Sequence, residues 1–275
     1  MDFSSIKEYL KPDLDRVQDL MNTSLASDIE LLDKTNQRVL AHSGKQVRPV
    51  LALLTAKACS GGFVTEETIH FAAAAELIHN ATLLHDDVAD NSPVRRGEPT
   101  VMSLLGGRAS VLLGDYWLVK GIESVLSVNT FSGKVIRIFS NTLSDLAEGE
   151  LLQLQKADTC DATESDYYRI IYNKTASLFV ASANTAAISV SASDEKRKAA
   201  KLYAECLGIA FQIKDDIFDY EGGDLTGKPS GLDLEERKIT LPLLGAFVNA
   251  GEDMEKEIRA LVARADEDAD SRKKI

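Results

Sequence analysis

The sequence has few cysteines, few prolines and no long hydrophobic run. Its 275 residues include 3 Cys and 6 Pro. The cysteines, Cys59, Cys160 and Cys206, are odd in number and far apart, which favours reduced thiols over a disulfide framework and predicts a cytoplasmic protein. No stretch approaches the ~20 apolar residues of a membrane span, and the N-terminal segment lacks the basic and apolar regions of a signal peptide. We therefore expect no stable membrane insertion.

Positive charge is also scarce. The chain has 31 Lys and Arg against 43 Asp and Glu, which gives a formal net charge of −12. Proteins that bind nucleic acid need a basic surface, so we expect no nucleic-acid partner. An anionic small molecule would be repelled on average, and its binding would require a bound cation or a local cluster of basic side chains.

Most of the chain has the periodicity of amphipathic or buried helices. Ala, Leu, Glu and Lys recur throughout, and no convincing strand pattern is present. Residues 221–237, with four glycines and a proline, and residues 91–100 are predicted loops. We predict an all-α fold, a single-domain helical bundle with a central cavity. Its helices are expected within 5–40 and over 50–59, 65–90, 108–128, 131–157, 164–190, 195–220, 239–250 and 252–267.

Two acidic motifs of the form DDxxD are the most informative feature of the chain. The first comprises Asp86, Asp87 and Asp90, and the second Asp215, Asp216 and Asp219. On a helix, positions i, i+1 and i+4 fall within about 100° of arc, so each set of carboxylates shares one face. Clustered carboxylates repel one another unless a cation lies among them. The pair of motifs therefore predicts sites for hard divalent cations such as Mg²⁺.

Basic residues follow both motifs and occur in two further segments. Arginine forms a bidentate fork for phosphate oxygens and lysine a point charge. Mg²⁺ binds proteins through one or two carboxylates together with phosphate oxygens. Acidic motifs and cations together therefore predict a magnesium-dependent diphosphate site. The basic residues are Arg95, Arg96, Lys228, Lys238, Lys45, Arg48 and Lys174.

Several short motifs follow one another along residues 40–245. They are GKxxRP at 44–49, His79, HDDxxD with RRG at 85–97, GD at 114–115, EGE with Gln153, Lys174-Thr175, FQxxDDxxD at 211–219, GKPxGxD at 227–233 and Lys238. In this order they resemble the trans-isoprenyl diphosphate (polyprenyl) synthases. The resemblance implies the all-α isoprenoid synthase fold, two or three Mg²⁺ ions per active site and a homodimer.

The resemblance also implies residue roles. Asp86, Asp87 and Asp90 would bind two Mg²⁺ ions on an allylic diphosphate, and Asp215 a third, supported by Asp216 and Asp219. Thr175 and Gln212 would line the reacting centre. The allylic diphosphate would be held by Arg95, Lys174, Lys228 and Lys238, and isopentenyl diphosphate by Lys45, Arg48, His79 and Arg96.

The implied reaction is ionisation, condensation and elimination. The metal ions and basic groups would stabilise charge developing on the leaving diphosphate. The carbocation would be attacked by the double bond of isopentenyl diphosphate held beside it. No side chain is an obvious general base, and the resemblance suggests that the released diphosphate takes the proton.

Residues preceding the first motif bear on product length. Thr82 lies one helical turn before Asp86 and Ile78 two turns, about 6 and 12 Å along the axis. Similar short-chain enzymes carry large aromatic residues four or five positions before the first Asp, whereas this chain has Ala81 and Thr82 there. We predict a long all-trans product of the hexaprenyl to decaprenyl class, as used for quinone side chains. The floor of the pocket that holds the growing product would come from residues 117–125.

Four alternatives remain. A short-chain farnesyl or geranylgeranyl diphosphate synthase is the nearest. A class I terpene cyclase shares the fold but usually has a different second metal motif. A His-Asp phosphohydrolase would need further His ligands, and an inactive partner subunit would be expected to lose its Asp motifs. Similar proteins continue for several helices beyond Leu241-Pro242, so we expect one synthase domain over 1–275, truncated at its C-terminus.

Overall fold

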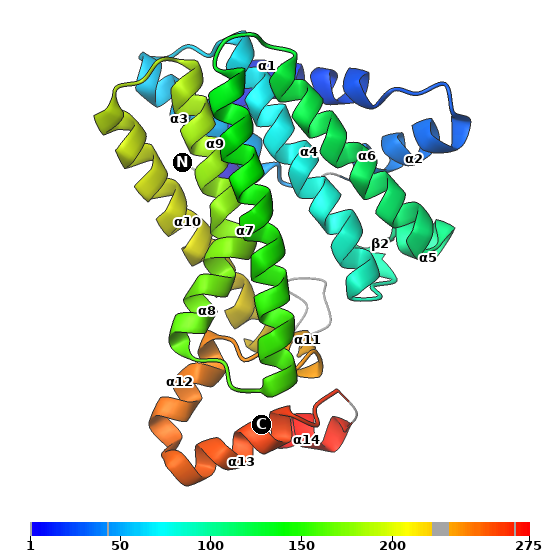
Figure 1. Ribbon diagram of the computed structural model, residues 1–275, viewed down its shortest axis with the longest axis vertical. Coiled ribbons are helices and arrows are strands. Elements are labelled where there is room, and N and C mark those ends of the chain that lie inside the picture. The colour runs from blue at the N-terminus through cyan, green and yellow to red at the C-terminus, as the bar shows by residue number, and fades with distance from the viewer. Residues whose placement is uncertain (1, 43, 222–230, 267) are drawn as a thin grey trace. The chain divides into compact units, whose positions relative to one another are not determined.

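The computed structural model describes residues 2–42, 44–221, 231–266 and 268–275, and it confirms the predicted all-α class (Figure 1). Its helices are α1 (Phe3–Leu25), α2 (Glu30–Ala41), α3 (Val47–Ser60), α4 (Glu66–Ala89), α5 (Val101–Leu105), α6 (Gly107–Leu126), α7 (Ser132–Thr159), α8 (Glu164–Ile171), the π-helical turn η1 (Tyr172–Ala176), α9 (Ser177–Ser189), α10 (Asp194–Glu221), α11 (Leu232–Glu235), α12 (Leu241–Ala250), α13 (Glu252–Val262) and α14 (Ala269–Lys274).

The chain forms two compact units. Unit 1 comprises Met1–Asn141 and Leu178–Ala204, and unit 2 comprises Thr142–Ser177 and Glu205–Ile275. Helices α7 and α10 contribute residues to both units, as does the continuous run from α8 to α9. The first acidic motif therefore belongs to unit 1 and the second to unit 2.

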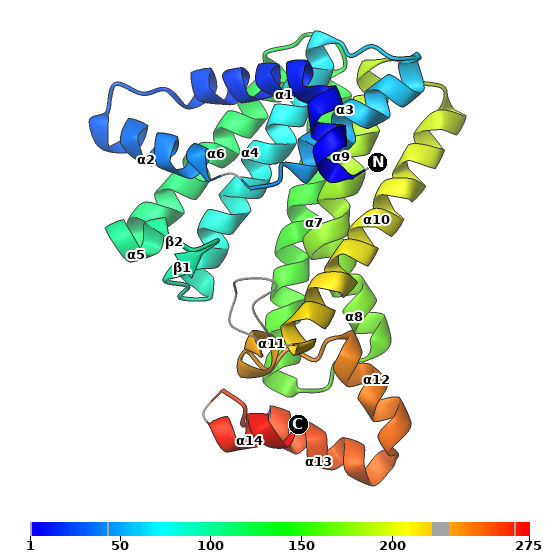
Figure 2. The ribbon, with the colours of Figure 1, turned by 180° about the vertical axis from the view of Figure 1, so that it is seen from behind.

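Helix α4 forms the centre of unit 1. It packs along α6 and also contacts α1 and α3 (Figures 1 and 2). The alanines at 72–75 are fully buried, and these small side chains allow neighbouring helices to come close. Gly121 of α6 lies against Ile78 of α4, where an added Cβ would be 3.0 Å from Cγ1 of Ile78. The helix that carries the first motif is thus fixed on several sides.

Unit 2 has its own hydrophobic core, formed by α8, α12 and α13. Tyr167 and Ile171 of α8 are buried with Leu243 and Phe247 of α12 and Val262 of α13. Partly buried residues of α10 pack against this cluster. The core therefore supports the part of α10 that carries the second motif.

Several local predictions can be compared with the structure. Thr65 caps α4 as expected, through a capping box with Thr68. The prediction that 91–100 is only a loop was wrong, because β1 (Val94–Arg95) pairs with β2 (Glu98–Pro99) in a hairpin. The loop predicted over 221–237 contains α11, while its residues 222–230 lie outside the described part of the chain. Within the described part of the chain, every helix is too short or too polar to span a bilayer.

Candidate active site

The first motif lies at the C-terminal end of α4. Asp87 is buried, Asp86 is partly exposed, and Asp90 is an exposed C-cap residue just beyond the last helical residue. Nε of Arg95 donates to Oδ1 of Asp87 at 2.6 Å. Because the C-terminal end of a helix carries partial negative charge, carboxylates there are favoured by a nearby cation. Arg95 supplies that cation to the middle carboxylate.

The hairpin β1–β2 directs its two arginines to different partners. Arg96 has φ +55° at the turn, next to Gly97 with φ +82°, as a two-residue hairpin of type I′ requires. Its Nη1 donates to the backbone oxygen of His42 at 2.9 Å. The guanidinium also lies against Gly44, where an added Cβ would be 2.5 Å from Cζ. The glycine of GKxxRP therefore provides the space that Arg96 occupies.

A charge cluster around the buried Glu76 lies beside this arginine in unit 1. The guanidinium of Arg48 is 4.9 Å from the ring centroid of Phe179, and burial lowers the pKa of Arg48 to about 10. Glu76 is fully buried, and this burial raises the pKa of its carboxyl to about 6 despite the charges of Arg48 and Arg96. Among the described residues, Nε of Arg48 and Oε2 of Glu76 have no hydrogen-bond partner. Such groups are suited to bind a polar ligand or water.

His79 belongs to the same cluster. Burial, followed by the charges of Arg48, Arg96 and Arg95, lowers the pKa of His79 well below its usual 6.5. The imidazole is therefore neutral near pH 7, when it can donate one hydrogen bond without adding charge. Three of the four residues predicted for isopentenyl diphosphate, Arg48, His79 and Arg96, thus lie together, and the fourth, Lys45, is exposed just before α3.

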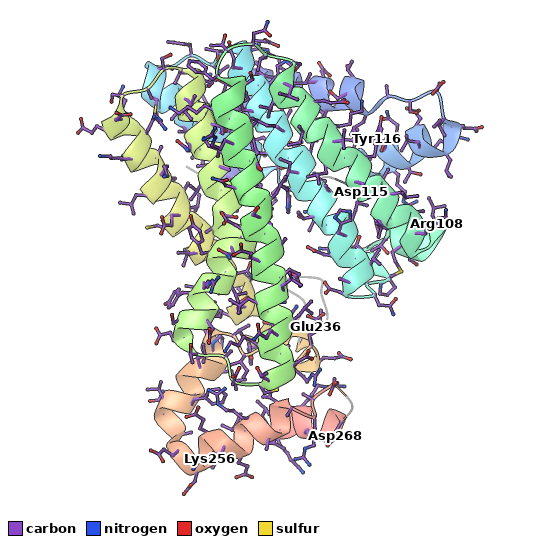
Figure 3. All side chains as sticks on the ribbon, in the orientation of Figure 1. Arg108, Asp115, Tyr116, Glu236, Lys256 and Asp268 are labelled. Atoms are coloured by element: carbon purple, nitrogen blue, oxygen red, sulfur yellow. The ribbon has the colours of Figure 1, made fainter. Side chains whose placement is uncertain are left out.

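The GD motif supports the helix of the first acidic motif. Nε2 of His85 lies 3.3 Å from Oδ1 of Asp115, which projects from α6 (Figure 3). An added Cβ on Gly114 would be 2.3 Å from the same nitrogen. Glycine at 114 therefore leaves room for the imidazole next to Asp86.

The second motif lies within α10. Asp215 is exposed, whereas Asp216 is buried. Asp219 accepts hydrogen bonds from the backbone nitrogens of Leu232 at 3.2 Å and Asp233 at 3.0 Å, which ties α11 to this helix. Burial, followed by the charges of Asp219 and Asp216, raises the pKa of Asp233 to about 7. Asp219 is therefore held by protein donors, and Asp215 is the exposed carboxylate of this motif.

Lys174 and Thr175 lie on the π-helical turn η1. Single π-turns are rare and occur often at functional sites. Nζ of Lys174 pairs with Oε2 of Glu150 at 2.5 Å. An added Cβ on Gly149 would be 2.9 Å from Cγ of Lys174, so α7 approaches this side chain closely. Glu150 and Gly149 together place the ammonium group of Lys174.

A cavity of about 140 Å³ in unit 2 brings several predicted residues together. Lys238 pairs with Glu236, which is labelled in Figure 3. Lys228 lies outside the described residues. The polar residues lining the cavity are Gln153, Lys156, Tyr167, Lys174, Gln212, Asp216, Asp233, Lys238 and Thr240.

The sequence prediction missed several residues of these clusters. Glu76 could have been found, because it is the one charged residue in the apolar run Phe71–Ile78. Glu150 and Asp233 lie within the EGE and GKPxGxD motifs, but the resemblance assigns them no role. Tyr167 carries no sequence signal, because its polar contact is with Asp216, far along the chain.

Some carboxylates of the two acidic motifs are accessible to a hard divalent cation such as Mg²⁺. Asp86, Asp90 and Asp215 present oxygen donors that are exposed or partly exposed. Among the described residues, no three His, Cys, Asp or Glu side chains are grouped as a complete metal site. Mg²⁺ commonly completes its octahedral shell with phosphate oxygens and water, and it needs only one or two protein carboxylates.

The chain is similar to known proteins over most of its length. Residues 29–275 match the family model described as polyprenyl synthetase. The chain is 37% identical over 263 residues to the octaprenyl diphosphate synthase of Escherichia coli, which covers 95% of this chain and 80% of the relative. It is 36% identical to the all-trans-nonaprenyl-diphosphate synthase of Rhodobacter capsulatus, over 91% of this chain and 76% of the relative. A short chain isoprenyl diphosphate synthase of Methanothermobacter thermautotrophicus is 34% identical, over 88% of this chain and 75% of the relative.

A solved structure extends the likeness to three dimensions. The polyprenyl synthase of Caulobacter crescentus, crystallised with calcium and isoprenyl diphosphate, superimposes with a TM-score of 0.89 at 32% identity. The match covers 99% of this chain and 82% of that one.

Proposed function

Because this chain belongs to the polyprenyl synthetase family, we propose that it is a prenyltransferase that condenses an allylic diphosphate with isopentenyl diphosphate. The match of the family model to residues 29–275 carries the proposal. The reaction breaks the allylic C–O bond and forms a bond from the resulting carbocation to the double bond of isopentenyl diphosphate. Loss of a proton from the adduct then gives the longer allylic diphosphate.

We propose that both acidic motifs serve one turnover. Asp86, Asp87 and Asp90 would hold two Mg²⁺ ions and Asp215 a third, with Asp216 and Asp219 supporting it. Bound Mg²⁺ would supply positive charge against the diphosphate leaving group. Divalent metal dependence is supported by the accessible carboxylates and by the calcium in the Caulobacter crescentus structure.

The cations divide between two diphosphates in this proposal. Arg95, Lys174, Lys228 and Lys238 would hold the allylic diphosphate, and Lys45, Arg48, His79 and Arg96 isopentenyl diphosphate. The charge cluster around Glu76 supports the second assignment, because a diphosphate would compensate Arg48 and Arg96 beyond what Glu76 alone provides. A neutral His79 can donate to a phosphate oxygen.

The remaining steps depend on what surrounds the reacting carbon. Thr175 and Gln212 would line the reacting centre; Oγ1 of Thr175 donates to Oε1 of Gln212 at 2.6 Å, so both side chains are already oriented. The released diphosphate would take the proton lost from the adduct. Apolar walls would exclude water from the carbocation.

We propose a long product, of the hexaprenyl to decaprenyl class, as used for quinone side chains. Ala81 is buried on α4, and Thr82 donates to the backbone oxygen of His79 at 2.8 Å, so the positions five and four residues before Asp86 carry small side chains. Ile78, one turn earlier, is also buried. The octaprenyl and nonaprenyl relatives share more identity with the chain than the short-chain relative does. Trp117, which was expected near the floor of the product pocket, is fully buried, and its Nε1 donates to Oδ1 of Asn36 at 2.8 Å.

We also propose a homodimer. Leu112, Val119 and Leu126 are exposed at heptad spacing on α6, which forms an apolar stripe along that helix. A second copy of the chain would bury the stripe in a symmetric interface. Light scattering should report a dimer for the wild type and a monomer for Leu112→Glu/Val119→Glu. Leu202→Glu, at an exposed leucine of α10, is the control, and a monomeric wild type would refute the dimer.

The elongation assay tests the proposed activity. Purified protein is incubated with Mg²⁺, farnesyl diphosphate and labelled isopentenyl diphosphate, and label in the acid-labile allylic product is counted. We expect incorporation that EDTA abolishes and added Mg²⁺ restores. Absence of incorporation would exclude the synthase, and incorporation unaffected by EDTA would exclude the metal roles.

A further inference from the structure

Tyr167 is the one buried tyrosine that touches an acidic motif through its hydroxyl group among the described residues. It lies on α8, where its ring is 2% exposed within the core of unit 2. Its hydroxyl donates to Oδ2 of Asp216 at 2.6 Å. A buried tyrosine hydroxyl usually has a hydrogen-bond partner, and here that partner is the middle carboxylate of the second acidic motif.

The other oxygen of Asp216 is also engaged. Nε2 of Gln212 donates to Oδ1 of Asp216 at 2.8 Å, one helical turn away on α10. Both carboxylate oxygens therefore accept from neutral protein donors. Asp216 cannot rotate to a new position without losing a buried hydrogen bond, and such a loss is costly.

The network continues to the π-helical turn. Oε1 of Gln212 accepts from Oγ1 of Thr175, the residue after Lys174. Helix α10 also approaches this turn closely, because an added Cβ on Gly208 would be 2.6 Å from Cα of Ala176. Four side chains, Tyr167, Asp216, Gln212 and Thr175, thus join α8, α10 and η1 within unit 2.

We propose that Tyr167 is a positioning residue for the second acidic motif, and that it acts through Asp216 and Gln212 to fix the face of α10 carrying Asp215 relative to Thr175. The inference rests on the proposed function. Tyr167 itself touches neither metal nor reacting atoms. Residues behind a metal ligand orient it, and their loss typically weakens metal affinity.

The test compares Tyr167→Phe with Tyr168→Phe. Both changes remove one hydroxyl from neighbouring residues of α8. Tyr168 is 38% exposed, and its ring makes an edge-to-face contact with that of Tyr167. Two quantities are measured: the Mg²⁺ concentration for half-maximal turnover, and the affinity for inorganic diphosphate with Mg²⁺ by calorimetry.

We expect Tyr167→Phe to raise the Mg²⁺ requirement about tenfold or more and to weaken the affinity for magnesium diphosphate in proportion. Tyr168→Phe should stay within about twofold of the wild type in both measurements. A Tyr167→Phe protein with wild-type Mg²⁺ requirement and diphosphate affinity would overturn the proposal, even if its stability had changed.

A second variant guards against a folding defect. Thr175→Val breaks the far end of the network, and a double-mutant cycle with Tyr167→Phe should show strongly non-additive effects on magnesium-diphosphate affinity. Additive effects would contradict a connected network. Because calorimetry needs no turnover, these results are distinguishable from failure of the synthase activity itself, which would be seen as a wild-type protein that does not elongate.

Discussion

The two acidic motifs share a sequence pattern but hold their middle carboxylate differently. In unit 1, Asp87 is paired with a cation, Arg95 of the hairpin. In unit 2, Asp216 accepts from two neutral donors, Tyr167 and Gln212, and burial raises its pKa. Arg95 neutralises the charge of Asp87, whereas Tyr167 and Gln212 orient the carboxylate of Asp216 without neutralising it. Two motifs with the same sequence pattern can therefore contribute differently to stability and to metal binding.

The largest expected effect concerns the accessible first aspartate of each motif. Asp86→Ala and Asp215→Ala should each lower kcat about 10²–10³-fold, because each removes charge stabilisation of the leaving group. Steady-state rates with labelled isopentenyl diphosphate measure this. Asp194→Ala, which alters a highly exposed carboxylate of α10, is the control. A near-normal rate in either motif variant would mean that one motif is dispensable.

Product length should depend on the residue five positions before the first motif and not on the corresponding residue before the second. Ala81 and Ala210 each lie five residues before the first aspartate of their motif, but Ala81 is buried and Ala210 is exposed. Ala81→Phe should shorten the product without abolishing turnover, because a large ring would block the path beneath Asp86. Ala210→Phe should leave product length unchanged. Chromatography of the dephosphorylated products measures their chain length. Equal lengths from Ala81→Phe and the wild type would mean that the growing prenyl chain does not pass Ala81.

Stability should reflect how each middle carboxylate is held. Arg95→Met leaves Asp87 buried without its counter-charge, and we expect a loss of about 3 kcal/mol. Tyr167→Phe removes one hydrogen bond from a neutral donor, with an expected loss of about 1–2 kcal/mol. Urea unfolding curves of the two variants provide the comparison. Losses that are equal, or in the reverse order, would contradict the distinction between a neutralised and an oriented carboxylate.

The last expected effect is a pH dependence of stability from His79, which vanishes above its ordinary pKa. Its pKa in the folded protein is lowered from 6.5, so below that pH the unfolded state binds more protons and stability falls as pH falls. The carboxyl of Glu76, whose pKa is raised from 4.5 to about 6, has the opposite effect, because between these two pH values it increases stability as pH falls. His79→Gln removes only the first contribution.

The free energy of unfolding of His79→Gln, relative to the wild type, should therefore rise by about 1.4 kcal/mol per pH unit below 6.5. Urea unfolding at several pH values measures it. His42→Gln, at an exposed histidine just beyond α2, controls for the loss of an imidazole. A difference between His79→Gln and the wild type that does not vary with pH would show that His79 is not held neutral by burial.

Local patterns predicted the helices well, since the period of apolar residues and the cap at Thr65 are properties of neighbouring residues. The hairpin at 94–99 was missed because strands of two residues are too short to show alternation. Tyr167 and Glu76 acquire their roles from tertiary contacts and burial, which no local pattern encodes. The motifs located the carboxylates and cations, but they could not show that Asp87 and Asp216 are already occupied by protein donors.

The central claim is that this chain makes a long all-trans polyprenyl diphosphate. The most direct measurement is the size of the dephosphorylated products that the wild-type protein makes from farnesyl diphosphate and excess labelled isopentenyl diphosphate with Mg²⁺. We predict a product between hexaprenol and decaprenol. Products that stop at geranylgeraniol would contradict the claim and establish the short-chain alternative.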